Sequence, residues 1–222
     1  MVLRGPLKTP HQFMKQLFLH IGSHRTGTTS VQQYLKDNIP QLLENGIQYD
    51  TWGYETGLDL NELSAIKSKV RLGISIEKMV GDKVVWSSEG FFGDPWKGYS
   101  NIGTVAEETR RMFGSTDTTI IAIIRKKEDF IKSFFSLYKK NVGLYRERNL
   151  LHPDFKEKKY EEHCSFLNAF SFNWDELLGE YRKRFDKVRV FNYEGLDVIN
   201  TILEVIDTPI RNNKEYRLNR SG

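Results

Sequence analysis

The chain has 222 residues, a length that suits one domain and allows a sizeable hydrophobic core. Hydrophobic residues make up 39% of it and charged residues 28%, which is typical of a globular protein. A net charge of +4 is too small to indicate a nucleic-acid partner. The single cysteine, Cys164, excludes an intramolecular disulfide and a multi-cysteine metal site.

No segment predicts membrane insertion or export. No apolar run approaches the roughly 18 residues that a membrane span needs. The N-terminal stretch MVLRGPLKTPHQFMKQ has no apolar signal core. We therefore expect a cytoplasmic protein without a membrane span.

Apolar runs separated by helical patterns predict the fold class. The runs are rich in Ile, Val, Leu and Phe with little alternation, as in strands buried on both faces of a parallel sheet. They cover residues 17–21, 83–87, 119–124 and 188–191, with a shorter run at 47–49. Helical spacing is found over 31–42, 61–79, 105–113, 130–140 and 175–185, with Pro40 as a kink and Gly46 as a stop. The alternation predicts an α/β protein with a mainly parallel central sheet.

We expect one domain over residues 1–222, with an N-terminal extension over 1–16 and a basic, aromatic insertion over 138–165. Within that insertion, residues 138–160 hold seven basic residues and three acids. The basic residues form either a solvated helix and loop or a surface for an anionic ligand. Ligands of open α/β sheets bind at the carboxyl ends of the strands, so chemistry is expected just after each apolar run.

A glycine-framed turn follows the first predicted strand and leads directly into a helix. It consists of Gly22, Ser23, His24, Arg25, Thr26, Gly27, Thr28 and Thr29. Such a turn cradles anions, because its N–H groups point inward and the helix N-terminus adds partial positive charge. The spacing nearly matches the phosphate loop G-x-x-x-x-G-K-[ST], but Thr28 stands in place of the lysine that reaches the β- and γ-phosphates. The loop therefore suits a 5′-phosphate that carries a different group.

The stretch LHIGSHRTGTTSVQQYL, with LLENGIQYD after it, resembles the 5′-phosphosulfate loop of the sulfotransferases. That family uses 3′-phosphoadenosine 5′-phosphosulfate (PAPS) and typically has Lys-x-Gly-Thr-Thr here, where this chain has arginine at Arg25. The resemblance implies a P-loop nucleotide-kinase-like three-layer fold, with PAPS as co-substrate and 3′,5′-adenosine bisphosphate (PAP) as product. It also implies that the turn over 22–29 binds the 5′-phosphosulfate and that no metal is required.

The third predicted strand ends in Arg125, and Ser133 follows eight residues later on the polar stripe of a helix. This spacing resembles the 3′-phosphate site of the same family. An arginine at a strand end presents a planar fork that matches phosphate oxygens. Lys126 and Lys127 replace the acid–proline pair that is usual in the family, which adds positive charge near the phosphate. The alternative for Arg125 is a surface salt bridge to Glu128 or Asp129.

Glu89 lies just past the second long strand, beside Trp86, Phe91 and Phe92. In several carbohydrate sulfotransferases, a glutamate after this strand is the general base. Aromatic neighbours would raise the pKa of a carboxyl there by desolvation, which suits proton abstraction near neutral pH. The alternative is a glutamate that caps a helix or pairs with a lysine. His20 and His24 are the competing candidates for the base.

The resemblance implies that sulfuryl transfer goes to an acceptor hydroxyl, with Glu89 as base and Arg25 stabilising the leaving bridge oxygen. The glutamate favours a sugar or glycolipid acceptor, whose rings would stack on aromatic side chains. The candidates for stacking are Trp52, Tyr54, Trp96 and Tyr99. The segment Tyr193-Glu194 looks like a turn of the family with a structural role.

Two other classes of function stay open. One is a small-molecule kinase with a degenerate phosphate loop, which would need magnesium and the missing lysine. The other is a catalytically inactive nucleotide-binding module, favoured by arginine in place of lysine at Arg25. A kinase is distinguished from a sulfotransferase by binding Mg-ATP rather than PAP. An inactive module is distinguished from an enzyme by the absence of turnover with any acceptor.

Overall fold

The structure is a computed structural model that describes residues 15–49, 81–95, 98–113, 116–136 and 173–212. The predicted helix over 61–79, nearly all of the N-terminal extension and the insertion over 138–165 lie outside these ranges. Within them, no helix is long and apolar enough to cross a membrane.

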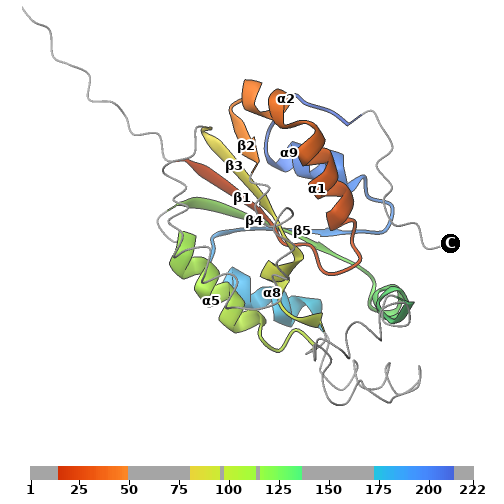
Figure 1. Cartoon of the computed structure of the whole chain (residues 1–222). Helices are drawn as coiled ribbons and strands as arrows, with labels where there is room; N and C mark the ends of the chain where they lie inside the picture. The colour runs from red at the N-terminus through yellow and green to blue at the C-terminus, as the bar shows by residue number, and fades with distance from the viewer. Residues whose placement is uncertain (1–14, 50–80, 96–97, 114–115, 137–172, 213–222) are drawn as a thin grey trace, which may run out of the picture.

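Five parallel strands form one sheet in the order β2-β3-β1-β4-β5 (Figure 1). Their bounds are β1 Gln16–His20, β2 Ile47–Tyr49, β3 Lys83–Ser87, β4 Asp117–Ile124 and β5 Lys187–Asn192. The expected α/β class with a parallel sheet is therefore confirmed. β2 and β3 have the predicted bounds, whereas β1 begins and ends one residue earlier than the apolar run. The pairing nevertheless continues past β1, because Ile21 N donates to Ile121 O.

Helices cover both faces of the sheet (Figure 1). On one face lie α1 (Thr28–Asp37), α2 (Ile39–Glu44) and α9 (Val198–Val205). On the other lie α5 (Ile102–Phe113), α8 (Trp174–Arg182) and a helix that includes residues 127–136, with the short 3-10 helix η2 (Glu89–Phe92). Successive residues of a strand point to opposite faces of the sheet. Phe18 and Val85 pack against the first group, and Leu19 and Trp86 pack against the second.

The helix α9 was not predicted, although the sequence carries its signals. Asp197 caps it by accepting a hydrogen bond from Asn200 N. Ile199, Ile202 and Leu203 then follow at helical spacing and are buried. A turn is predicted at Tyr193-Glu194 but no helix after it, so this apolar pattern is a missed signal.

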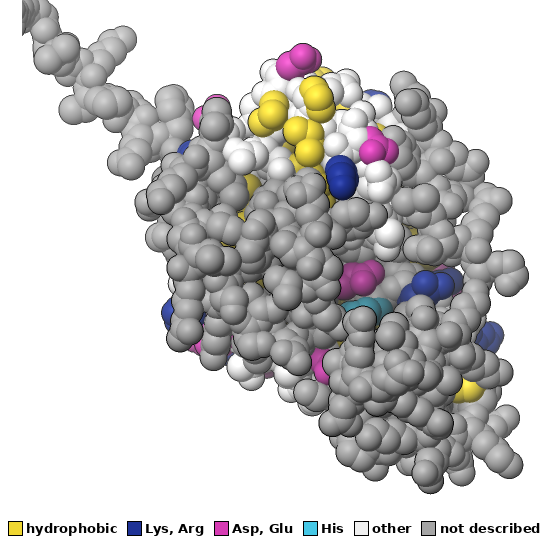
Figure 2. All heavy atoms as spheres, in the orientation of Figure 1, with side chains coloured by type: hydrophobic (Ala, Val, Ile, Leu, Met, Phe, Trp, Pro, Cys, Tyr) yellow, Lys and Arg dark blue, Asp and Glu magenta, His cyan; other side chains and the backbone are white. Residues whose placement is uncertain are grey.

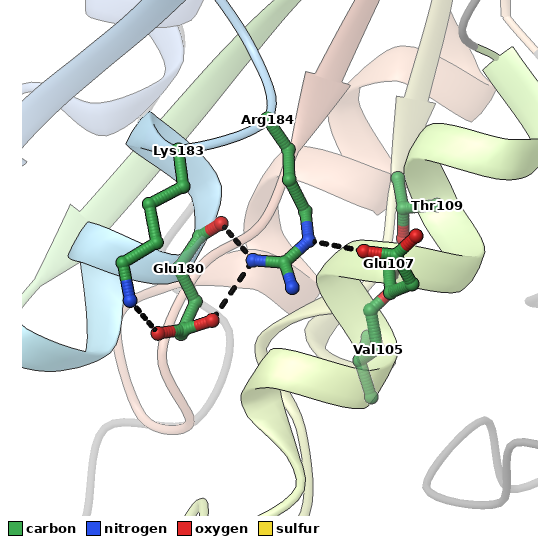
Figure 3. Close-up of polar contacts among 6 residues, drawn as sticks. All are labelled: Val105, Glu107, Thr109, Glu180, Lys183 and Arg184. Atoms are coloured by element: carbon green, nitrogen blue, oxygen red, sulfur yellow. Dashed lines mark hydrogen bonds and ion pairs between the residues drawn. The ribbon is translucent and has the colours of Figure 1, made fainter.

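An ion-pair network joins α5 to the C-terminal end of α8 (Figure 3). Arg184 donates from Nε to Glu107 at 2.7 Å and from an Nη to Glu180 at 2.8 Å. Lys183 also bonds the Glu180 carboxylate. The hydrogen bond from Lys183, followed by that from Arg184, lowers the pKa of Glu180. The network therefore stabilises the fold above the ordinary pKa of a glutamate and loses this contribution as acid protonates Glu180.

Arg184→Met should lower the free energy of unfolding at pH 7 by about 0.5–1 kcal/mol, because it removes the charge and keeps most of the apolar stem. The difference from wild type should shrink between pH 7 and pH 3, because acid progressively protonates Glu180 and removes the charge that Arg184 meets. Denaturant unfolding at the two pH values measures it. An equal loss at both would mean that packing, and not charge, is what Arg184 contributes.

Candidate functional site

The loops that follow β1, β3 and β4 meet at the carboxyl edge of the sheet. His20 at the end of β1 pairs with Ser87 at the end of β3. The next residues keep the loops together, since Ser88 N donates to His20 O at 3.0 Å and Ser23 N donates to Ile123 O at 2.9 Å. The turn over 22–29, Glu89 and Arg125 therefore emerge side by side, as the topology predicted. Near the centre of Figure 2, acidic, histidine and basic side chains lie next to one another.

The β1–α1 loop, residues 21–27, has a backbone shaped like an anion-binding nest. Arg25 has φ 70° and Gly27 has φ 81°, so two left-handed residues flank Thr26. Such alternation turns successive N–H groups toward one point. Gly22 is required for a different reason, because a Cβ there would lie 2.5 Å from Thr28 Oγ1 and 2.8 Å from Thr26 Oγ1.

The N–H groups of this loop divide into two sets. Those of Ser23 and His24 are used inside the protein, on Ile123 O and on the Tyr99 hydroxyl. Those of residues 25–29 donate to no group in the part of the chain that the structure describes. The N–H groups that stay available to an anion are therefore those over 25–29, at the N-terminus of α1, which are the amides that the sequence predicts for the 5′-phosphosulfate.

Three buried side-chain atoms around this loop lack a hydrogen-bond partner among the described residues. They are Ser23 Oγ, Thr28 Oγ1 and His20 Nε2. Two of them, Thr28 Oγ1 and His20 Nε2, lie within 3.2 Å of the point that a Cβ on Gly22 would occupy. Buried polar atoms are nearly always hydrogen-bonded, so unpaired ones gathered at one loop point to a polar ligand or water there.

His20 does not fit the role of base. Its side chain is fully buried, and its Nδ1 lies 2.8 Å from Ser87 Oγ. Burial lowers its pKa to about 3, so the ring is neutral at physiological pH. With so low a pKa the ring is a weak proton acceptor, and its fully buried side chain exposes no surface to an acceptor hydroxyl.

The two loops expected to bind the nucleotide contact each other directly. Arg25 Nε donates to Ser133 Oγ at 2.9 Å. Arg125 donates from an Nη to the carbonyl oxygen of Arg25, at 3.3 Å. Arg25 is thus brought to Arg125 and Ser133, which lie 100 and 108 residues further along the chain.

Arg125 is held from several sides. Its Nε lies 3.7 Å from a carboxylate oxygen of Glu194, and its guanidinium lies 5.1 Å from the ring centre of Tyr193. Glu194 also accepts the N–H of Lys126, at 3.0 Å. The partner of Arg125 is therefore Glu194, and no contact with Glu128 or Asp129 is found among the described residues. The turn at Tyr193-Glu194 has the structural role expected for it.

Glu89 is the first residue of η2 and is half-buried. The hydroxyl of Ser88 caps this short helix by accepting a hydrogen bond from Gly90 N, at 3.2 Å. Glu89 itself is therefore not the capping residue. Phe92 is fully buried, and Trp86 and Phe91 stack within the core at 6.4 Å between ring centres.

Tyr99 bonds to the β1–α1 loop and lies within electrostatic range of Glu89. Its hydroxyl accepts the N–H of His24 at 3.3 Å and contacts His24 Nδ1 at 3.2 Å. Burial raises the pKa of Tyr99 well above its usual value, and the negative charges of Glu89 and Asp94 raise it further. The phenol therefore keeps its proton at physiological pH.

The expectation that Tyr99 stacks on a sugar is wrong, because its side chain is fully buried among aromatic rings. The other aromatic candidates, Trp52, Tyr54 and Trp96, lie outside the described residues. Sequence reasoning also missed Trp174, whose Nε1 donates to Arg125 O at 2.7 Å. No local motif predicts the bond between Tyr99 and His24 or the bond between Trp174 and Arg125, because these partners lie 75 and 49 residues apart.

Comparison with known proteins gives no relative: no protein-family model matches the chain, and neither does any curated protein. Functional inference therefore depends on the geometry of this edge of the sheet. The arrangement offers anion-binding amides, two arginines and a half-buried carboxylate at neighbouring loops.

Proposed function

We propose that the protein is a PAPS-dependent sulfotransferase with a P-loop nucleotide-kinase-like fold. The observation that carries the proposal is the set of N–H groups over 25–29 that donate to no described residue, next to Arg25, Arg125 and Ser133. The strand order β2-β3-β1-β4-β5, with the nest directly after the central strand β1, supports the fold assignment. A nucleotide with phosphates at both ends of its ribose would match this double anion site.

The roles divide between the loops. The amides over 25–29 and the hydroxyls of Thr28 and Thr29 bind the 5′-phosphosulfate, and Arg125 with Ser133 binds the 3′-phosphate. Glu89 takes the proton of the acceptor hydroxyl as its oxygen attacks sulfur. The bond between sulfur and the bridging oxygen breaks, and PAP leaves. Arg25 and the helix N-terminus stabilise the negative charge that grows on the bridging oxygen.

The acceptor is a hydroxyl of a sugar or glycolipid in this proposal. The placement of Glu89 after β3 carries this part of the proposal. A kinase is disfavoured because Thr28 stands in place of the lysine and offers no cation to the γ-phosphate. Arginine at Arg25 keeps the positive charge of the family lysine but releases a proton far less readily.

Thermal unfolding in the presence of nucleotides tests the proposal. PAP without magnesium should raise the melting temperature, because a ligand at 100 times its Kd stabilises the folded state by about 2.7 kcal/mol. Mg-ATP at the same concentration should have a smaller effect. Stabilisation by Mg-ATP alone would support a kinase, and binding of PAP without turnover on any acceptor would support an inactive module.

Arg25→Ala should reduce the rate of sulfuryl transfer more than it weakens PAP binding, because the charge that Arg25 meets is largest in the transition state. Arg25→Lys should retain or improve the rate, since it restores the residue usual in the family. Single-turnover rates and PAP affinity, measured on the same preparations, separate the two effects. Transfer by Arg25→Ala at the wild-type rate would contradict the role given to this side chain.

A further inference from the structure

An aromatic cluster packs beside the β1–α1 loop and Arg125, with three buried rings and one half-buried ring, that of Trp174. The cluster consists of Phe92, Tyr99, Phe130 and Trp174. Its ring centres lie 5.0–6.1 Å apart, and several pairs meet edge to face, which is the favoured geometry of aromatic packing. The rings come from η2, the segment before α5, the helix over 127–136, and α8.

Two members of this cluster carry a polar atom, and each polar atom bonds to a different loop. The hydroxyl of Tyr99 bonds to His24 in the β1–α1 loop. The indole N–H of Trp174 donates to the carbonyl of Arg125, at 2.7 Å. The rings of Tyr99 and Trp174 are 6.1 Å apart. The two loops are thus linked through a rigid apolar body as well as through Arg25.

Tyr99 has a backbone conformation that needs an explanation. Its φ is 59°, which is uncommon for a residue with a bulky side chain and carries a cost in strain. Its N–H donates to Asp94 O and its carbonyl accepts from Ile102 N, both at 2.9 Å, so neighbouring structure holds it there. This conformation delivers the Tyr99 hydroxyl to His24, which lies directly before Arg25.

We propose that Tyr99 and Trp174 are positioning residues of the nucleotide site: Tyr99 holds the 5′-phosphosulfate loop and Trp174 holds the 3′-phosphate arginine. The inference rests on the proposed function, since it assigns each residue to one end of PAPS. Neither side chain touches the nucleotide. Each acts by fixing the backbone from which Arg25 or Arg125 extends.

The two roles are separable because AMP carries only the 5′-phosphate, whereas PAP carries both. Tyr99→Phe removes one hydroxyl and keeps the ring, so it should weaken AMP and PAP by the same factor, about 3- to 10-fold. Trp174→Phe should weaken PAP by a similar factor and AMP much less. The ratio of the two affinities should therefore fall for Trp174→Phe and stay constant for Tyr99→Phe. If the two residues only stabilised the fold, both variants would have a lower melting temperature, and the ratio of PAP to AMP affinity would not differ between them.

Tyr181→Phe is the matched control. Tyr181 is fully buried on the same face of the sheet, and its hydroxyl donates to the carbonyl of Phe91. The variant loses a buried hydroxyl as Tyr99→Phe does, without a contact to either loop, so its affinities should equal those of wild type. If Trp174→Phe does not fold, benzothienylalanine at position 174 removes the N–H and keeps the bicyclic shape.

Isothermal titration of AMP and PAP against the full chain and these variants gives the result. Affinities of the Tyr99 and Trp174 variants that match Tyr181→Phe would overturn the positioning roles and leave the proposed function intact. The same holds if both variants change the ratio of affinities equally. Wild-type protein that binds neither nucleotide would overturn the proposed function and the positioning roles together.

Discussion

Glu89→Gln should fold, bind PAP with an affinity near that of wild type, and lose at least about a hundredfold in turnover. A positioned general base contributes roughly 10²- to 10⁴-fold to a rate, and the amide of glutamine cannot accept the proton. The substitution preserves shape and hydrogen-bonding reach, so the loss falls on the chemical step. Turnover under saturating PAPS, together with PAP affinity, measures the two quantities.

The position of Glu89 is the reason for expecting so large an effect. It starts η2 directly after β3, and β3 is hydrogen-bonded to β1, whose own loop is the proposed phosphosulfate site. The negative charge of Glu89 raises the pKa of the Tyr99 hydroxyl. That hydroxyl accepts a hydrogen bond from His24 N in the β1–α1 loop. The carboxylate therefore lies at the same edge of the sheet as the amides over 25–29. An acceptor hydroxyl between them would meet the base and the sulfur from opposite sides.

Asp94→Asn provides the matched control, because Asp94 follows η2 and its charge also acts on Tyr99. It makes the same change from carboxylate to amide at a buried position with no proposed contact to the acceptor. Its activity per folded molecule should stay near that of wild type. A stable Glu89→Gln with full activity would direct the search for the base to His24, since His20 is buried and its low pKa makes it a weak base.

The strands were predictable because most of them are buried on both faces. β3 and β2 have the predicted bounds, and β3 carries three consecutive buried apolar residues. β5 extends one residue beyond the predicted run at each end, because on this sheet edge exposed Lys187 and Asn192 are tolerated within the strand. The local apolar pattern predicts which strand residues are buried. It does not predict the residue at which an edge strand ends.

The sequence predicted which loops form the site. It did not predict the residues that pack behind these loops and bond to them. Parallel topology places every strand-end loop at one edge, so Arg25, Glu89 and Arg125 could be expected near one another. Tyr99 and Trp174 have the hydrophobic character of core residues, and their polar atoms find partners only in the folded chain. Their roles depend on contacts between distant segments, which neither composition nor spacing encodes.

Arg125→Ala should weaken PAP far more than AMP. Each charge-assisted hydrogen bond from Arg125 to a 3′-phosphate is worth on the order of 1.5–3 kcal/mol, which corresponds to about 10- to 150-fold in affinity. AMP lacks that phosphate, so it should lose only what the Arg125 side chain contributes by holding the carbonyl of Arg25. That contact is a single bond of 3.3 Å to a neutral oxygen, and its loss should change AMP affinity by only a few fold.

Lys126→Ala is the control for this prediction, because it removes one positive charge from the next residue, whose side chain is exposed. A general electrostatic attraction would make the two variants alike, and added salt would weaken both. A specific contact makes Arg125→Ala much the weaker binder of PAP. The geometry favours the specific contact, because Glu194 and the ring of Tyr193 hold the guanidinium beside the β1–α1 loop. Equal losses of AMP and PAP in Arg125→Ala would assign Arg125 to the support of the Arg25 loop, and the 3′-phosphate would need another cation.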